Sequence, residues 1–200
     1  MPAASSPPPA SATRERILDA AARVLRERGV AHATTKEIAR AAGCSEALLY
    51  KHFADKQDIY MGVLRERVGG MADYGELAGS GDVRENLVDV VDGFLGFYGQ
   101  TFPMSMSVFS SQDFLLAWRG QLTGRGAGPR SPIRMVERYL QDEIELGRLG
   151  RELDAYAAAS MLCGAAFQHA FLACFDGLDA VPDARALAER LVDALALPLE

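Results

Sequence analysis

Cysteine is scarce in this sequence, and the cysteines that occur are far apart. Only Cys44, Cys163 and Cys174 are present, an odd number without a close pair, so we expect no disulfide framework and a reducing, cytoplasmic environment. No Cys-x-x-Cys or His-x-x-x-His spacing occurs, and Cys163 and Cys174 would lie roughly 16 Å apart along one helix. The sequence therefore predicts no zinc or other metal site.

Catalytic motifs are also missing. The chain has no Gly-x-Ser-x-Gly elbow, no phosphate-binding Lys loop and no paired carboxylates at a defined spacing. A Gly-x-Gly-x-Gly run lies in the expected surface loop 120–130, but it follows no strand and lacks the spacing of a dinucleotide fold. We expect no cofactor and no catalytic residue, so the protein is predicted not to be an enzyme.

Strong charge of one sign is absent, and the charge is unevenly spread. The net charge is −6, which argues against a protein that coats nucleic acid generally. Residues 1–68 nevertheless hold 11 basic and 8 acidic side chains, a net +3, whereas residues 69–200 carry a net −9. The three lysines of the chain all lie in the basic part, at Lys36, Lys51 and Lys56. A basic head on an acidic body is typical of sequence-selective DNA binding.

No basic region followed by an apolar run occurs at the N-terminus, so we expect no secretory signal. Residues 1–12 are mostly Pro, Ala and Ser, and they hold too little apolar surface to fold. We therefore predict a disordered tail over 1–12.

Two short helices with a sharp break are predicted between Thr34 and Phe53. Thr34 and Glu37 have the spacing of a capping box, which marks a helix start. Gly43 suits the end of that helix, because glycine adopts a positive φ at little cost. Ser45 can cap the second helix. Two helices joined by a short turn with a glycine form the helix-turn-helix pattern.

The second helix has two distinct faces. At 100° per residue, Leu49 and Phe53 fall on one side and are predicted to face the core. Ala47 and Lys51 fall on the opposite side, which is small and cationic. Such a face suits a helix that lies in the major groove of DNA.

These features together resemble a known family. The run from Ile17 to Leu64, with ILDAAARVLRERGV followed by TTKEIARAAGCSEALLYKHFADKQDIYMGVL, is similar to the N-terminal domain of the TetR family of bacterial transcriptional regulators. It covers about a quarter of the chain. The resemblance implies an all-α fold, with a three-helix helix-turn-helix head over 13–54 and a helical ligand-binding and dimerisation domain over 55–200.

The resemblance also implies DNA-contacting positions. Contacts to the DNA backbone are expected from Thr35, Lys36, Ser45, Tyr50, His52 and Lys56, and base reading from Glu46, Ala47, Leu48 and Lys51. Glu46 departs from the neutral or basic residue that is common there. It either accepts a hydrogen bond from a cytosine amine or is repelled by phosphate. Arg14 and Arg16 fit phosphate contact and a solvated helix face equally well.

The acidic body is predicted to bind an apolar molecule. A fifth helix opens with Asp82 and Glu85, and its glycines at 93, 96 and 99 either allow close helix packing or leave room for a ligand. Aromatic and methionine side chains adapt to apolar guests, although each taken alone also fits core packing. The candidate ligand-binding residues are Phe94, Phe97, Tyr98, Phe102, Met106, Phe109, Phe114, Trp118, Phe167, His169 and Phe171.

The last third is predicted to hold three helices. Ser131 caps the first of them, with Pro132 at its first position. Residues 155–175 carry no charge, a length that fits a membrane span, but they are rich in Ala and Gly and lack a flanking basic cluster. We therefore expect a buried helix that needs a partner on its second side. By the resemblance, this helix and a last one over 183–197 form a four-helix interface in a homodimer.

The expected function follows from the resemblance. We expect a cytoplasmic bacterial repressor, associated with the nucleoid when bound, that leaves a palindromic DNA operator when an apolar or aromatic inducer of unknown identity binds. No membrane partner is expected. The alternatives are a helical protein-interaction adaptor, or a carrier of apolar ligands with a non-functional DNA head.

Overall fold

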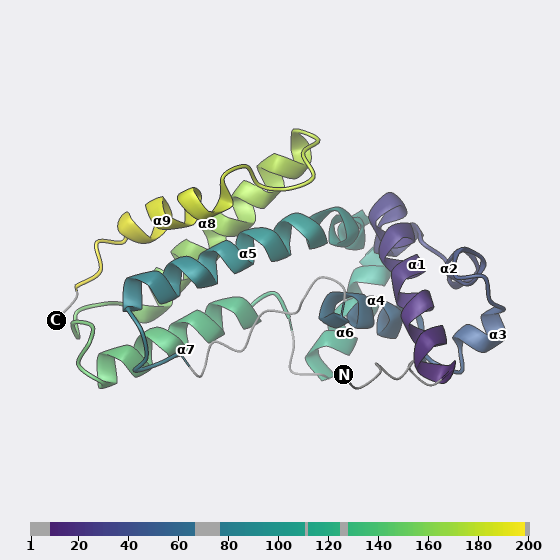
Figure 1. Ribbon diagram of the computed structural model, residues 1–200, viewed down its shortest axis with the longest axis horizontal. Helices are drawn as coiled ribbons and strands as arrows, with labels where there is room; N and C mark the ends of the chain where they lie inside the picture. Colours follow the sequence, from purple (N-terminus) through teal and green to yellow (C-terminus); the bar gives the residue numbers. More distant parts are fainter. Residues whose placement is uncertain (1–8, 67–76, 111, 125–127, 199–200) are drawn as a thin grey trace, which may run out of the picture. The chain divides into compact units, whose positions relative to one another are not determined.

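The computed structural model describes residues 9–66, 77–110, 112–124 and 128–198, and its elements there are helical (Figure 1). The predicted all-α fold is thus confirmed. The helices are α1 (Pro9–His32), α2 (Thr35–Ala41), α3 (Glu46–Leu49), α4 (Lys56–Glu66), α5 (Val83–Ser105), the 3-10 helix η2 (Met106–Ser110), α6 (Gln112–Gly124), α7 (Ser131–Glu145), α8 (Ala155–Phe175) and α9 (Ala184–Asp193).

The described residues pack as two compact units. The first combines α1 to α4 with residues 103–118, which are the end of α5, η2 and the start of α6. The second holds the rest of α5 and the helices α7 to α9. The sequence prediction ended the head at residue 54, whereas α4 and residues 103–118 pack with the head in the structure.

The core of the first unit is built around α1. Apolar residues at helical spacing, such as Ile17 and Leu25, are fully buried there. Leu49 and Phe53 face this core with 0% and 3% exposure, as predicted. Met104 joins the same cluster from the end of α5, which explains why that segment belongs to the head.

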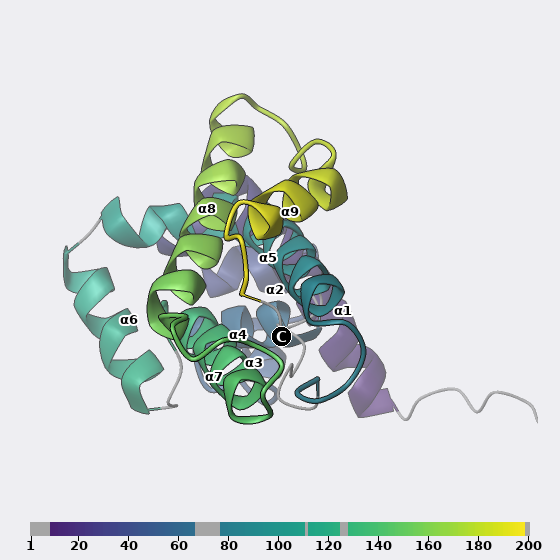
Figure 2. The ribbon, with the colours of Figure 1, turned by 90° about the vertical axis from the view of Figure 1, so that its left-hand side faces the viewer.

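The second core lies between α5, α7, α8 and α9. In Figure 2, α7 and α9 lie on either side of α5, and α8 runs beside them. Phe94 of α5 and Leu140 of α7 are fully buried, and α8 contributes small side chains such as Ala159 and Ala166. Small residues let neighbouring helices approach closely, so this face of α8 packs tightly against the rest of the unit.

The N-terminal caps predicted from short sequence spacings are mostly confirmed. The capping box of Thr34 and Glu37 is complete, and Ser45 Oγ accepts from Leu48 N at 3.1 Å. Helix-capping carboxylates accept from backbone N–H groups three residues on, at Asp55, Asp82 and Asp154.

Some predicted boundaries were wrong. The N-cap of α7 is Arg130 instead of Ser131, because Pro132 lacks an N–H and fits anywhere in the first turn. Helix α6 runs on to Gly124, through part of the predicted loop 120–130, since a glycine weakens a helix by only about 1 kcal/mol. Helix α1 starts at Pro9, inside the predicted tail, and residues 1–8 lie outside the description. Helix α9 ends at Asp193, before the predicted Leu197.

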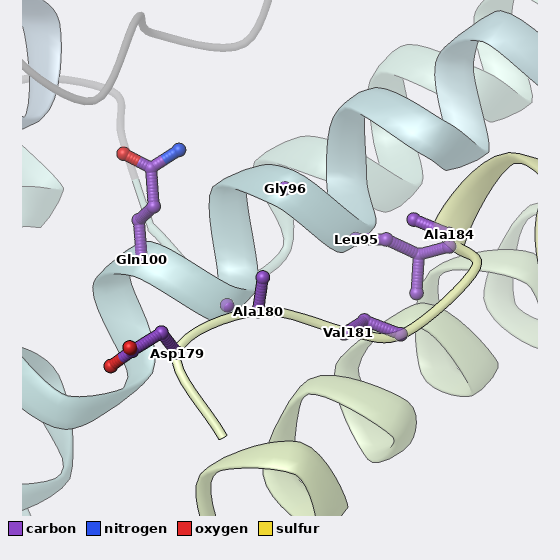
Figure 3. A pocket seen from close by; sticks show the side chains of 8 residues that line it. Leu95, Gly96, Gln100, Asp179, Ala180, Val181 and Ala184 are labelled. Carbon is purple, nitrogen blue, oxygen red and sulfur yellow. The ribbon is translucent and has the colours of Figure 1, made fainter.

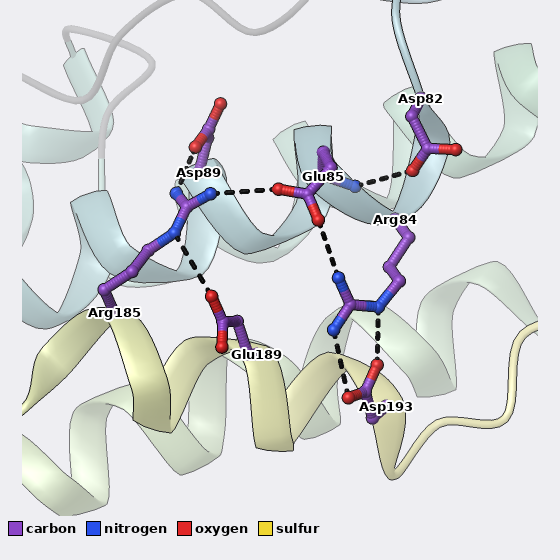
Figure 4. Close-up of polar contacts among 7 residues, drawn as sticks. All are labelled: Asp82, Arg84, Glu85, Asp89, Arg185, Glu189 and Asp193. Carbon is purple, nitrogen blue, oxygen red and sulfur yellow. Dashed lines mark hydrogen bonds and ion pairs between the residues drawn. The ribbon is translucent and has the colours of Figure 1, made fainter.

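Exposed ion pairs attach α9 to α5 (Figure 4). Arg84 donates two hydrogen bonds to Asp193, from Nε at 2.6 Å and from Nη2 at 3.0 Å. Arg185 binds Asp89, and it binds Glu85 at 3.1 Å. The hydrogen bond from Arg84 lowers the pKa of Asp193, so this contact persists until the pH falls below the ordinary range of an aspartate. Because all these groups are solvated, the ion pairs add little stability, and their main effect is to fix the position of α9 along α5.

Helix α1 changes direction at Gly29, where a side chain of η2 meets it. Gly29 has a φ of 73°, outside helical geometry. Beyond it, Ala31 N donates to Ser107 Oγ at 3.0 Å, and Ser107 Oγ donates to Met104 O at 3.2 Å. A Cβ atom on residue 29 would lie 2.5 Å from Ser107 Oγ. The turn therefore needs glycine both for its backbone angle and for the close approach of Ser107.

We predict that Gly29→Ala destabilises the protein more than Gly43→Ala does. Both glycines have a positive φ, but a Cβ on Gly43 would meet no atom within 4 Å. Gly43→Ala should cost about 1–2 kcal/mol for the backbone angle alone, and Gly29→Ala about 1–3 kcal/mol more because it also displaces Ser107. Urea unfolding of both variants measures the difference. Equal losses would show that the Ser107 contact has no energetic weight.

Candidate nucleic-acid interface and ligand body

The predicted DNA-facing side of α3 is open to solvent. Ala47 and Lys51 are exposed, and Tyr50 has an exposed fraction of 50%. On α2, Lys36 is exposed as well. Leu48 and the other predicted contact residues range from half-buried to exposed. The opposite side of α3 is buried through Leu49, so the two faces lie as the sequence predicted.

Helix α3 itself is short. Its regular part ends at Leu49, and the chain then tightens, with Lys51 N donating to Leu48 O at 3.2 Å and His52 N donating to Leu49 O at 3.0 Å. Phe53 N still donates to Leu49 O at 3.1 Å, which returns Phe53 to the core. The 3-10-type turn keeps Lys51 exposed while the aromatic ring of Phe53 is buried.

Three of the predicted contact residues also contact each other. Thr35 Oγ1, at the start of α2, lies 2.6 Å from Glu46 Oε1, and it lies 3.2 Å from the hydroxyl oxygen of Tyr50. The sequence pattern placed Thr35 and Tyr50 only as DNA-backbone contacts. It gave no signal for this cluster, because its members come from two different helices.

Lys56 reaches the end of α1. Its Nζ donates to Ala31 O at 3.2 Å and to Ala33 O at 3.0 Å. Partial burial lowers the pKa of the ammonium group. Free carbonyls at a helix C-terminus attract a positive charge, so Lys56 ties the start of α4 to the last turn of α1. The expected phosphate contact of Lys56 stays a prediction, and this structural role was missed.

Arg14 is engaged within the head. Its guanidinium group pairs with Glu66 at the end of α4 through both Nη atoms, with Nη2 at 2.7 Å from Oε1. The same group lies 5.2 Å from the ring centroid of Phe53. These contacts favour the structural role for Arg14. Arg16 is exposed.

An aromatic row joins α5 to α8 in the second unit. The rings of Tyr98 and Phe167 are 5.5 Å apart, and those of Phe102 and Phe167 are 5.1 Å apart. Phe97 and Phe171 extend the row at its two ends, with centroid distances of 5.6 Å to Tyr98 and to Phe102. Phe94, the sixth member, lies 6.0 Å from Tyr98. Desolvation raises the pKa of Tyr98. The structure thus brings together six predicted ligand residues.

The other predicted ligand residues are not in this row. Met106, Phe109 and Trp118 belong to the first unit, where the ring of Trp118 packs edge-on against Tyr60 at 4.7 Å. His169 stands about 200° around α8 from Phe167, so it does not share that face. The side chain of Phe114 lies outside the description.

Two glycines of α5, Gly96 and Gly99, border a small cavity of about 100 Å³, which is also lined by Leu95, Gln100, Asp179, Ala180, Val181 and Ala184 (Figure 3). At Gly96 and Gly99 an added Cβ would meet no atom within 4 Å, so close helix packing does not explain these two residues. Sites for drug-sized ligands measure about 300–1,000 Å³, and this cavity is smaller. It is not lined by the aromatic row.

One face of α8 is apolar and exposed. Of the described helices, α8 is long and apolar enough to cross a membrane by length and composition, but 39% of its apolar window is buried inside the protein. The remaining face carries Met161, Phe167 and Phe175, with exposed fractions of 61%, 48% and 78%. An apolar surface of this kind marks an interaction site.

Comparison with known proteins matches the head to one family. Residues 17–61 match the model of the bacterial regulatory proteins of the tetR family. The repressor BepR of Brucella suis is 47% identical over 55 residues, which cover 28% of this chain and 26% of BepR. The chain thus matches about a quarter of the length of such curated relatives.

Solved structures match nearly the whole chain. FadR of Bacillus subtilis, solved with stearoyl-CoA, has a TM-score of 0.65 at 20% identity and covers 90% of this chain and 96% of its own. SmeT of Stenotrophomonas maltophilia, the repressor of a multidrug efflux pump, has a TM-score of 0.66 at 24% identity, with 94% and 91% covered. SmeT has also been solved with triclosan. At these identities the likeness establishes the fold, a helix-turn-helix head with a helical C-terminal domain.

We predict that Lys56→Met destabilises the protein by about 1–3 kcal/mol, because two carbonyls at the end of α1 lose a charged donor. Met retains the aliphatic length of the side chain. The control Lys51→Met removes a charge from an exposed position and should change stability by less than about 0.5 kcal/mol. Chemical unfolding compares the two variants. A similar loss of stability in both variants would show that the hydrogen bonds of Lys56 do not stabilise the head.

Proposed function

We propose that the chain is a TetR-family transcriptional regulator, and not an enzyme, and that it represses transcription as a homodimer on a palindromic operator. The observation that carries this proposal is the open, cationic face of α3 above a buried Leu49 and Phe53. A helix anchored in this way presents its outer side chains to the edges of bases in a major groove. We place the protein in the bacterial cytoplasm.

A second copy of the chain is the proposed partner of α8. The inner face of α8 is buried against its own unit through residues such as Leu162 and Ala166. The outer face is apolar, with small residues such as Gly164 between its large side chains. A bilayer would also have to cover the charged pairs of α5 and α9 beside it, which is costly, whereas a second copy covers only α8 and part of α9.

Two linked heads impose a geometry on the operator. A homodimer with two-fold symmetry reads two half-sites in inverted orientation, with centres about 34–36 Å apart. The charge distribution supports the same arrangement, since a body of net charge −9 over residues 69–200 is repelled by phosphate and leaves contact to the basic head.

An apolar or aromatic small molecule is the proposed inducer. The aromatic row of α5 and α8 supports this, because Met-rich or aromatic walls bind apolar ligands by shape and stacking. FadR and SmeT, which share the fold, were solved with stearoyl-CoA and triclosan, and both molecules carry large apolar parts. An inducer releases DNA only if it binds the released state more tightly than the DNA-bound state.

Selection from a random duplex library tests the DNA part of the proposal. The purified chain should enrich an inverted repeat whose half-sites are one helical turn apart. Enrichment of no sequence at low salt would refute the proposal. It would favour a protein-interaction adaptor that uses the exposed apolar face of α8, or a carrier of apolar ligands.

We predict that the double substitution Met161→Glu and Phe175→Glu yields a monomer that folds normally. Both side chains are exposed in the single chain, so the charges cost little until a second copy covers them. Sedimentation should report one chain, and binding to the selected operator should weaken by at least about 100-fold as the second head is no longer linked.

The matched control for that variant is Leu146→Glu. Leu146 is exposed to a similar degree, 57%, but it lies just past the end of α7. This variant should sediment like the parent chain and keep its operator affinity. A double variant that still dimerises would place the interface elsewhere.

A further inference from the structure

The hydroxyl of Thr35 connects the two helices of the reading motif. Thr35 is the first residue of α2, and its Oγ1 lies 2.6 Å from a carboxylate oxygen of Glu46, the first residue of α3. The Tyr50 hydroxyl oxygen lies 3.2 Å from the same Thr35 oxygen. The turn that joins α2 and α3 is thus bridged by side chains, of which Tyr50 is exposed and Thr35 and Glu46 are half-buried.

The direction of these hydrogen bonds is fixed by chemistry. An ionised carboxylate only accepts, so the single hydroxyl proton of Thr35 goes to Glu46 Oε1. The Thr35 oxygen can then serve only as an acceptor for Tyr50, whose hydroxyl must be the donor. The chain runs from Tyr50 to Thr35 to Glu46, and each bond polarises the next.

This chain leaves one oxygen of Glu46 for a ligand. Glu46 is half-buried, and its second oxygen, Oε2, has no hydrogen-bond partner among the residues that the structure describes. A negative charge in the first turn of a helix interacts favourably with the helix dipole. That interaction explains why an acidic residue stands at position 46, but it does not explain the contact with Thr35. The contact holds the carboxylate in one orientation before any DNA binds, which lowers the entropic cost of using it.

We propose that Glu46 reads an exocyclic base amine, at cytosine N4 or adenine N6, at one base pair of each half-site, and that Thr35 is the positioning residue for this contact. The proposal rests on the DNA-binding function proposed above. In the major groove cytosine N4 and adenine N6 donate hydrogens, whereas guanine O6 and thymine O4 only accept. Each base pair presents one such amine, on one of its strands, so a fixed carboxylate favours the orientation of the pair that places the amine next to it and disfavours the reversed pair, which places an acceptor there.

The sequence left two interpretations of Glu46 open: it either accepts a hydrogen bond from a base amine or is repelled by phosphate. A carboxylate that is merely repelled by phosphate would turn towards solvent and away from the groove. In the structure Thr35 donates to it, and Tyr50 contacts Thr35 in turn. Lys51, which is exposed in the turn after α3, remains available for phosphate or for an acceptor base.

Duplex selection with four proteins tests the inference: the parent chain, Glu46→Ala, Thr35→Val and Thr35→Ser. The parent should prefer one base pair by about tenfold or more at one position of each half-site, and whether that pair is C·G or A·T identifies the amine. Glu46→Ala should lose that preference and keep the others. Thr35→Val, which retains the shape but not the hydroxyl, should weaken the preference at the same position at least about threefold, and Thr35→Ser should retain it.

The outcomes separate a positioning role from a structural one. If Thr35→Val weakens binding to all sequences alike, Thr35 supports only the fold, and the inference is overturned. A preference at that position that survives Glu46→Ala also overturns it. If the parent chain enriches no sequence at all, the failure lies with the proposed DNA-binding function itself. Thermal unfolding of each variant confirms that it is folded.

Discussion

The unpaired backbone groups at the end of α1 must be satisfied by side chains from other helices, and this requirement holds the head together. Ser107 of η2 accepts from Ala31 N, and Lys56 of α4 donates to the carbonyls of Ala31 and Ala33. Helix α2 begins directly after this turn, at Thr35. The end of α1, which precedes α2, is therefore bonded both to α4 and to the segment that follows α5.

A similar requirement shapes the body. A helix that is apolar on all sides must be covered on all sides, and the single chain covers only one face of α8. Core packing against α5 and α7 accounts for the small residues on that face, such as Ala159. A second copy is the proposed cover for the other. The ion pairs between α5 and α9 keep α9 in register beside it, so the proposed interface is preassembled in each chain.

Local features could be predicted from sequence, and contacts between distant residues could not. The caps at Thr34 and Ser45 involve residues three positions apart, and the exposed and buried faces of α3 follow from a fixed angular step. The contact of Ser107 with Ala31 spans 76 residues, and that of Lys56 with Ala31 spans 25, so no periodicity reveals them. Sequence also could not show which candidate ligand residues lie near each other. The structure places Met106, Phe109 and Trp118 in the first unit and the aromatic row in the second.

The central claim is that two copies of one basic head, joined through their bodies, read a single duplex. The most direct measurement is the mass of the complex that the chain forms, at low ionic strength, with the DNA upstream of its own gene. We predict a complex of two chains on one duplex. A single bound chain, or no complex at all, would contradict the claim.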